Sequence, residues 1–156
     1  MSTDKHATVE ELEQRLKNKG IAPTAMRLLV FEYFLQQTFA QSLTDLEWHF
    51  NRADRTTLYR TLKTFEEKGL IHSIEDGTEA TRYALCAEGC RAGNHYDLHL
   101  HFFCYGCKRT ICLPRHKVPD VTVPDHFQLQ ELALIAKGLC DTCSQNNAIQ
   151  LHGTSK

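Results

Sequence analysis

Two cysteine pairs have the same internal spacing, Cys104-Tyr-Gly-Cys107 and Cys140-Asp-Thr-Cys143. Two residues between thiolates allow a turn in which both sulfurs approach one ion, and two such turns supply four ligands. Four thiolates form a closed, tetrahedral zinc site that leaves no position for water or substrate. A single pair would also fit a thiol redox motif, but its duplication favours a metal. We therefore predict a structural Zn²⁺ bound by these four cysteines.

A second ligand set is indicated by His99 and His101. If residues 98–104 form a strand, the two histidines share one face while Cys104 lies on the other, so they point away from the four-thiolate site. Two imidazoles make half a site, and His72 and Cys86, at the start and just past the end of a predicted hairpin, are the natural suppliers of the rest. One thiolate with three imidazoles suits tetrahedral Zn²⁺ better than octahedral Fe²⁺. We predict a regulatory site of His72, Cys86, His99 and His101, with Fe²⁺ as the alternative ion.

Other cysteines and histidines leave alternatives open. Cys90 could replace Cys86 as the thiolate of the regulatory site. Cys112, in Thr110-Ile-Cys-Leu, is expected to be a buried strand residue, which is the usual environment of a free cysteine. A third metal site is a further hypothesis, built from His95, Asp97, His116 and His126.

Composition and charge limit the possible partners. The chain has 156 residues, 42% of them hydrophobic, and a net charge of −1. Any nucleic-acid surface must therefore be local. The polar N-terminal sequence and the lack of a long apolar run predict a cytoplasmic protein that does not enter a membrane. Seven cysteines in a reducing compartment are more consistent with metal ligands than with disulfides.

The first half of the sequence has the element order of a winged helix-turn-helix. Apolar spacing and capping residues predict helices over 9–19, from Thr24 through Leu35, over 43–50 after Ser42, and over 55–68 after Asp54. Residues 70–74 and 80–85 predict a hairpin. Strands are expected over 98–104 and 128–139, and a short helix after Cys143. The predicted fold is α+β, with domains over residues 1–85 and 98–156 joined by a linker over 86–97.

The fourth predicted helix concentrates positive charge. From Arg52 to Lys63, four basic residues stand against the single acid Asp54. Hydrogen-bonding and aromatic side chains lie near its N-terminal end, where a recognition helix meets base edges in the major groove. A solvated amphipathic helix with ordinary ion pairs is the alternative. The DNA contacts predicted on this helix are Arg55, Thr57, Tyr59 and Arg60.

Several motifs, in order along the chain, resemble the ferric uptake regulator (Fur) family. They are Lys17-Asn-Lys-Gly-Ile-Ala-Pro-Thr-Ala-Met-Arg27, Thr56-Thr-Leu-Tyr-Arg-Thr-Leu62 with its exit Glu66-Glu-Lys-Gly-Leu-Ile71, His99-x-His101-x-x-Cys104-x-x-Cys107 and the closing cysteine pair. The resemblance spans residues 10 to 144. It implies a homodimeric, metal-dependent transcriptional repressor with an N-terminal winged helix and a C-terminal dimerisation domain.

On the family pattern Tyr59 and Arg60 would enter the major groove, while Lys17, Lys19 and Arg27 would meet the DNA backbone or minor groove. The expected partner is a double-stranded, AT-rich inverted repeat, and neither a membrane nor a small-molecule substrate is expected.

The pattern is most similar to the zinc-sensing branch, because His72 and Cys86 fall where that branch places an acid or histidine and a cysteine. The family often carries a histidine just ahead of the third helix, where this chain has Phe39-Ala-Gln-Ser42. Leu98, Leu100 and Leu132 occupy positions where an auxiliary site commonly uses polar ligands. The resemblance thus implies two zinc ions per chain and control of metal-uptake genes, with an iron-sensing regulator as the alternative.

Two other classes of protein stay open. One is a thiol redox enzyme, with Cys86 or Cys90 as nucleophile, and the other is a zinc-stapled interaction module whose basic helix meets an acidic protein. No nucleophile, base and orienting acid are spaced in a recognisable frame, so we expect no enzyme. Salt-dependent binding to an AT-rich inverted repeat, only with metal present, would separate the regulator from both.

Overall fold

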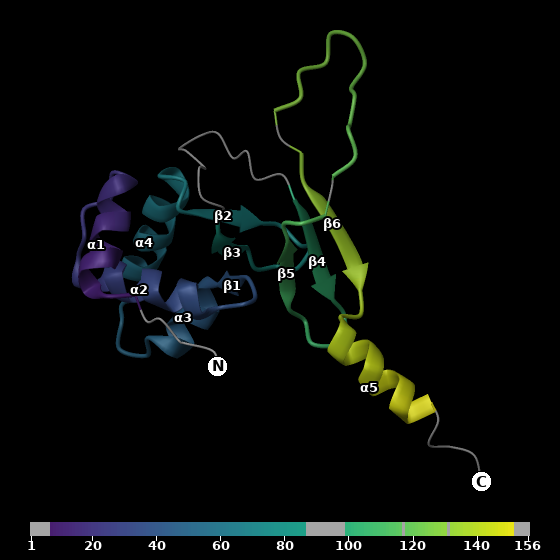
Figure 1. Cartoon of the computed structure of the whole chain (residues 1–156), viewed down its shortest axis with the longest axis horizontal. Coiled ribbons are helices and arrows are strands. Elements are labelled where there is room, and N and C mark those ends of the chain that lie inside the picture. Colours follow the sequence, from purple (N-terminus) through teal and green to yellow (C-terminus); the bar gives the residue numbers. More distant parts are fainter. Residues whose placement is uncertain (1–6, 87–98, 117, 131, 152–156) are drawn as a thin grey trace. The chain divides into compact units, whose positions relative to one another are not determined.

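The computed structural model describes residues 7–86, 99–116, 118–130 and 132–151, and the chain divides into two compact units, residues 1–97 and 98–156. Each unit has its own three-stranded sheet (Figure 1). Helices and strands together confirm the predicted α+β class. Among the described residues, none of the helices is both long enough and apolar enough to span a bilayer.

Four helices form most of the first unit: α1 (Val9–Asn18), α2 (Ala25–Gln36), α3 (Leu43–His49) and α4 (Arg55–Glu67). The predicted N-caps are confirmed, because Thr24, Ser42 and Asp54 each accept a hydrogen bond from the backbone N–H three residues ahead. These bonds satisfy amide donors that a helix start otherwise leaves without partners. Gly20 and Gly69, both with a φ of 69°, stop α1 and α4 in the left-handed conformation that glycine adopts without strain.

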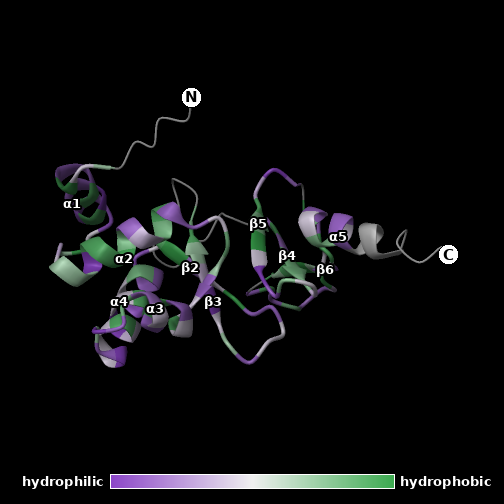
Figure 2. Cartoon of the chain, turned by 90° about the horizontal axis from the view of Figure 1, so that it is seen from below, coloured by the Kyte–Doolittle hydropathy of each residue, from purple (hydrophilic) through white to green (hydrophobic). Residues whose placement is uncertain are grey.

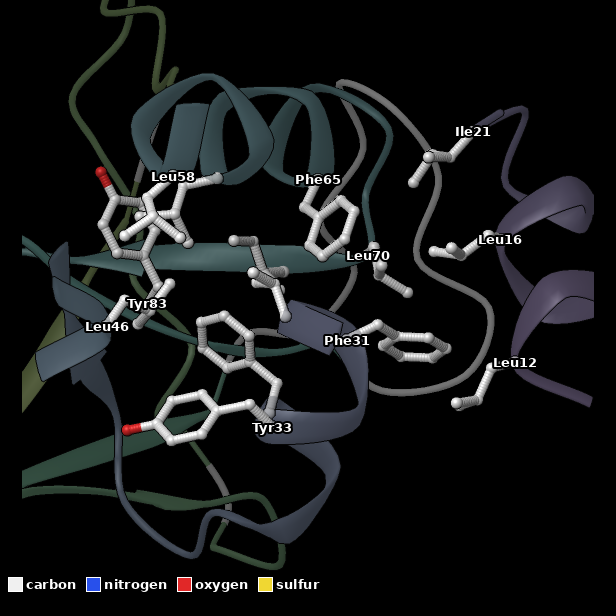
Figure 3. Close-up of a cluster of buried hydrophobic side chains, with 14 residues drawn as sticks. Leu12, Leu16, Ile21, Phe31, Tyr33, Leu46, Leu58, Phe65, Leu70 and Tyr83 are labelled. Carbon is white, nitrogen blue, oxygen red and sulfur yellow. The ribbon is translucent and has the colours of Figure 1, made fainter. Parts of the chain in front are cut away.

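Helix α2 is the centre of the hydrophobic core. Hydrophobic residues cover most of it (Figure 2), and Val30, Phe31 and Phe34 are buried. The rings of Phe31 and Phe65 meet edge to face with 6.4 Å between their centroids, which joins α2 to α4. In Figure 3 Leu12 and Leu16 reach from α1 toward Phe31. The core therefore fixes how α4 lies against the other helices of its unit.

The first sheet consists of β1 (Gln41–Ser42), β2 (Ile71–Ile74) and β3 (Arg82–Leu85), in the antiparallel order β1-β3-β2. The turn between β2 and β3 contains the buried Asp76. Its carboxylate accepts a hydrogen bond from Arg82 Nε at 3.0 Å. Arg82 also lies 3.7 Å from the carboxylate of Asp45 in the first turn of α3. These charges thus link the β2–β3 hairpin, which we call the wing, to α3, the helix that precedes α4.

The second unit contains β4 (Leu100–Cys104), β5 (Thr110–Leu113), β6 (Leu134–Gly138) and α5 (Asp141–Leu151). Strand β4 is central: it pairs antiparallel with β5 and parallel with β6. The strand predicted over 128–139 was too long, because only from Leu134 does the chain meet β4 as a partner. The predicted helix begins at Asp141, ahead of Cys143 rather than after it.

Candidate metal centres and nucleic-acid surface

The parallel pairing of β4 with β6 brings the two cysteine pairs together. Cys104 ends β4 and lies opposite Gly138, the last residue of β6. Parallel strands end at the same edge of a sheet, so the turn after β4 and the start of α5 after β6 meet there. One sulfur from each of Cys104, Cys107, Cys140 and Cys143 lies within 4.8 Å of the other three.

Backbone amides hold this cluster of four thiols. The N–H groups of Cys107 and Cys140 donate to the Cys104 sulfur, at 3.5 and 3.3 Å. The Cys107 and Cys140 sulfurs are 4.0 Å apart. A Cβ atom at Gly106 would come within 2.9 Å of the Cys143 side chain, so the turn needs a glycine for the cluster to close. Four converging sulfurs fit a tetrahedral Zn²⁺ without an open position.

Cys104 and Cys143 differ in acidity. Hydrogen bonds from the Cys107 and Cys140 amides lower the pKa of Cys104 to about 6, because they stabilise its thiolate. A side-chain hydrogen bond with Cys140, together with burial and the charge of Cys104, raises the pKa of Cys143 to about 12. The amide donors thus favour the thiolate form of Cys104, whereas Cys143 must give up a proton when a metal binds.

A second cluster lies on the other face of β4. His99 is buried, and its ring lies 4.4 Å from the ring of His101, centroid to centroid, at an interplanar angle of 49°. Cys112 lies directly opposite His101 across the antiparallel pair of β4 and β5, and directly opposed residues point to the same face. A ligand atom from each of His99, His101 and Cys112 lies within 4.8 Å of the other two. Cys112 is half-buried rather than buried as predicted.

The first unit holds the other two residues of the predicted regulatory set. His72 lies on β2 and is buried, while Cys86 follows β3. The Cys86 sulfur is 3.6 Å from His72 Nδ1. The backbone N–H of Cys86 donates to the Leu70 carbonyl and so extends the hairpin by one step. A thiol and an imidazole at this distance can both bind one metal ion.

The alternatives left open by the sequence fall partly outside the described residues, since Cys90, His95 and Asp97 lie there. His116 and His126 are exposed, and neither belongs to a group of three potential ligands in the described part of the chain.

The exposed face of α4 carries the side chains predicted to meet DNA. Leu58, Leu62 and Phe65 are fully buried, which leaves Tyr59 and Arg60 on the outer face. The Tyr59 ring is 46% exposed, and the Lys63 ammonium lies 5.8 Å from its centroid. A basic, aromatic face of this kind can meet phosphates and base edges.

Four of the other predicted DNA contacts make hydrogen bonds within the chain. Arg55 pairs with Glu47 on α3, a partner that the sequence did not indicate. The Thr57 hydroxyl shares the capping carboxylate of Asp54 at 3.3 Å. Lys17 pairs with Glu13 at 3.3 Å and is exposed, whereas Arg27 donates to the Ala22 carbonyl at 2.9 Å. Lys19, the remaining predicted contact, is half-buried.

Replacing Gly106 with alanine is expected to weaken the metal-bound form of the four-cysteine cluster. The added methyl group would meet the Cys143 side chain at 2.9 Å, and the sulfur would have to move out of the tetrahedron. Gly106→Ala should lose zinc to a chelator faster than the unaltered chain, as metal analysis after timed chelation would measure. Thr142→Ala, an exposed position inside the second cysteine pair, is the matched control. Equal zinc loss in all three proteins would contradict the proposed packing.

The model of the ferric uptake regulator family matches residues 18–123 of the chain. The peroxide operon regulator of Bacillus subtilis (strain 168) is 25% identical over 148 residues, covering 90% of this chain and 95% of that protein. A solved zinc uptake regulator complexed with zinc and DNA is similar at 22% identity and a TM-score of 0.64, covering 91% of this chain and 99% of that one. The Vibrio cholerae ferric uptake regulator gives 21% identity and a TM-score of 0.56, covering 82% of this chain and 98% of that one.

These similarities confirm the predicted α+β fold. The matched segment contains α2, α4, both strands of the wing and the first cysteine pair. Since it spans more than half of the sequence, the chain belongs to the ferric uptake regulator family of metal-binding, DNA-binding transcription regulators.

Proposed function

We propose that this regulator is a cytoplasmic, zinc-responsive repressor of metal-uptake genes, acting as a homodimer on an AT-rich inverted repeat. The observation that carries the proposal is that its potential ligands form two chemically different sets. Four sulfurs converge in a closed cluster, which suits a permanent structural ion. The second set combines three imidazoles with one thiol, and its residues belong to two units, which suits an ion that is bound reversibly.

The regulatory step is the joining of the two units by shared ligands. His72 and Cys86 belong to the winged unit, whereas His99 and His101 belong to the unit with the four cysteines. If one zinc ion bound all four residues, it would restrict the movement of each winged unit relative to the dimerised second units. Shifting an equilibrium from mostly open to mostly closed needs a differential affinity of about 5.5 kcal/mol, which is well below the roughly 10–16 kcal/mol measured for structural zinc sites.

DNA recognition is assigned to the outer face of α4. Tyr59 and Arg60 are the exposed residues best placed to meet base edges. Arg55 is held by Glu47, so its charge is partly neutralised before DNA binds. Lys17 and Lys19 near the end of α1 would contact phosphates. A similar zinc uptake regulator has been solved in complex with zinc and DNA, which supports this assignment.

The second unit offers a surface for a second copy of the chain. Strand β6 is at the edge of its sheet, and an edge strand presents backbone groups that can pair with another chain. The segment before it exposes large apolar side chains, namely Val121, Val123, Phe127 and Leu129. Burial of these side chains in a dimer would remove apolar surface from water.

Zinc is favoured over iron by the Cys86 thiol in the regulatory set, because soft sulfur ligands select zinc over metals that prefer nitrogen and oxygen. Iron is the second candidate, since ferric uptake regulators are also among the similar structures. A thiol redox enzyme or a protein-interaction module is less consistent with the features of this chain, because neither needs a recognition helix.

The roles of Arg60 and Lys19 in DNA binding are expected to differ. Arg60→Ala should cost about 1–3 kcal/mol and relax the sequence preference at one position in each half-site, because it removes a base contact. Lys19→Ala should weaken binding to all sequences alike and reduce the salt dependence by about one unit, because it removes a phosphate contact. Fluorescence anisotropy with a duplex selected from a random-sequence pool would measure both. If Arg60→Ala weakened random and selected duplexes equally, Arg60 would not read bases.

The choice of metal can be tested through Cys86. A dimer with zinc in its four-cysteine clusters and none in its regulatory sites should bind the selected duplex once free Zn²⁺ reaches a low concentration. A far higher concentration of Mn²⁺, the usual substitute for Fe²⁺, should be needed for the same DNA binding. Cys86→Asp should reduce this preference, because a carboxylate suits Mn²⁺ and Fe²⁺ better than a thiolate does. DNA affinity titrated against buffered Zn²⁺ and Mn²⁺ would measure the change, with Thr142→Ala as a control. Equal activation of the unaltered chain by both ions would favour iron.

A further inference from the structure

We propose that Lys63 and Glu66 position the Tyr59 ring for its contact with DNA, so that an ion pair on α4 contributes to the sequence preference. Neither residue is among the DNA contacts predicted from the sequence. The proposal rests on the proposed function, which assigns Tyr59 to the base edges, and it adds two positioning residues that act through the ring.

Helical spacing brings the three side chains together. Lys63 follows Tyr59 by four residues and Glu66 follows Lys63 by three, so all three lie along one side of α4. The Lys63 ammonium lies over the Tyr59 ring, 5.8 Å from its centroid. It also donates a hydrogen bond to Glu66 Oε2 at 2.9 Å. The carboxylate thus holds the ammonium, and the ammonium lies against the ring.

The charge of Lys63 attracts the face of the ring. An aromatic face carries partial negative charge, and a cation within about 6 Å of the centroid is attracted to it. The hydrogen bond with Glu66 raises the pKa of Lys63, so the ammonium form is favoured. The side chains of Lys63 and Glu66 are 42% and 22% exposed. Their attraction is therefore screened less by salt than that of a fully exposed pair.

The ion pair lies on a helix that is itself held firmly. Leu62 and Phe65, its neighbours on α4, are fully buried in the core. Tyr83 of β3 is also buried, and burial raises the pKa of its hydroxyl while the charge of Lys63 lowers it. Lys63 is thus close enough to the wing to act on a buried side chain there. The backbone of α4 is fixed, so the orientation of the Tyr59 ring is what the ion pair can change.

A ring that is already oriented loses less conformational freedom when DNA binds. The Tyr59 side chain is 46% exposed, and exposed side chains change rotamer within nanoseconds. Ordering such a side chain at an interface opposes binding. The attraction to Lys63 favours one arrangement before DNA arrives, and this raises the affinity for a duplex whose bases the ring contacts. Binding to a random duplex depends on phosphate contacts and gains nothing from the orientation of the ring.

A double variant that keeps the net charge tests the proposal in the zinc-loaded, full-length dimer. Lys63→Met/Glu66→Gln should bind the selected duplex about two- to fivefold more weakly. Its binding to random duplexes and its salt dependence should not change. Lys63→Arg, which keeps a cation for the ring, should retain the affinity. The matched control is Glu67→Gln/Lys68→Met, which removes an exposed acid and an exposed base at the end of α4 and should behave as the unaltered chain.

A phosphate contact by Lys63 is the outcome that would overturn the proposal. In that case the double variant would weaken the selected and random duplexes equally, and the salt dependence would fall by about one unit. Fluorescence anisotropy at several salt concentrations measures both quantities.

The same double variant in a Tyr59→Ala background shows whether the ion pair acts through the ring. Without the ring, Lys63→Met/Glu66→Gln should cause no further loss of affinity for the selected duplex, because coupled residues are not additive. An undiminished loss in this background would overturn the positioning role and leave the base contact of Tyr59 intact. Equal weakening of selected and random duplexes by Tyr59→Ala alone would instead contradict the assignment of Tyr59 to base edges, and the positioning role with it.

Discussion

The register of the strand β4 is the constraint on which both candidate metal centres depend. Its parallel pairing with β6 places Cys104 opposite Gly138 and so brings the second cysteine pair to the first. Its antiparallel pairing with β5 places Cys112 opposite His101. Because successive residues of a strand point to opposite faces, one strand can serve two separate clusters. A slip of one residue would exchange the faces and destroy both ligand sets.

The physical separation of the two clusters is consistent with the proposal that one ion stabilises the chain and a second ion acts as a signal. The four-sulfur cluster is enclosed by backbone amides that stabilise the Cys104 thiolate. The ligands of the other set belong to two units, and imidazole and thiol groups must lose protons before they bind. We therefore expect the first ion to be permanent and the second to exchange, and only the second to control DNA binding.

Features that depend on neighbouring residues in the sequence could be predicted from it. The helix caps at Thr24, Ser42 and Asp54 are of this kind, because a cap and the backbone N–H that donates to it lie three residues apart. Features that depend on pairing between distant segments could not. The contact of Arg55 with Glu47 and the position of Cys112 follow from helix packing and strand register. The strand β1 was missed because two residues carry no periodic signal.

The central claim is that the second zinc ion and DNA bind to the same closed state. By thermodynamic linkage, the factor by which zinc raises DNA affinity must equal the factor by which DNA raises zinc affinity. The most direct measurement is competition for the exchangeable zinc between the dimer and a fluorescent chelator, with and without the selected duplex. The proposed function predicts tighter zinc binding in the presence of the duplex, by the same factor. An unchanged zinc affinity would contradict it.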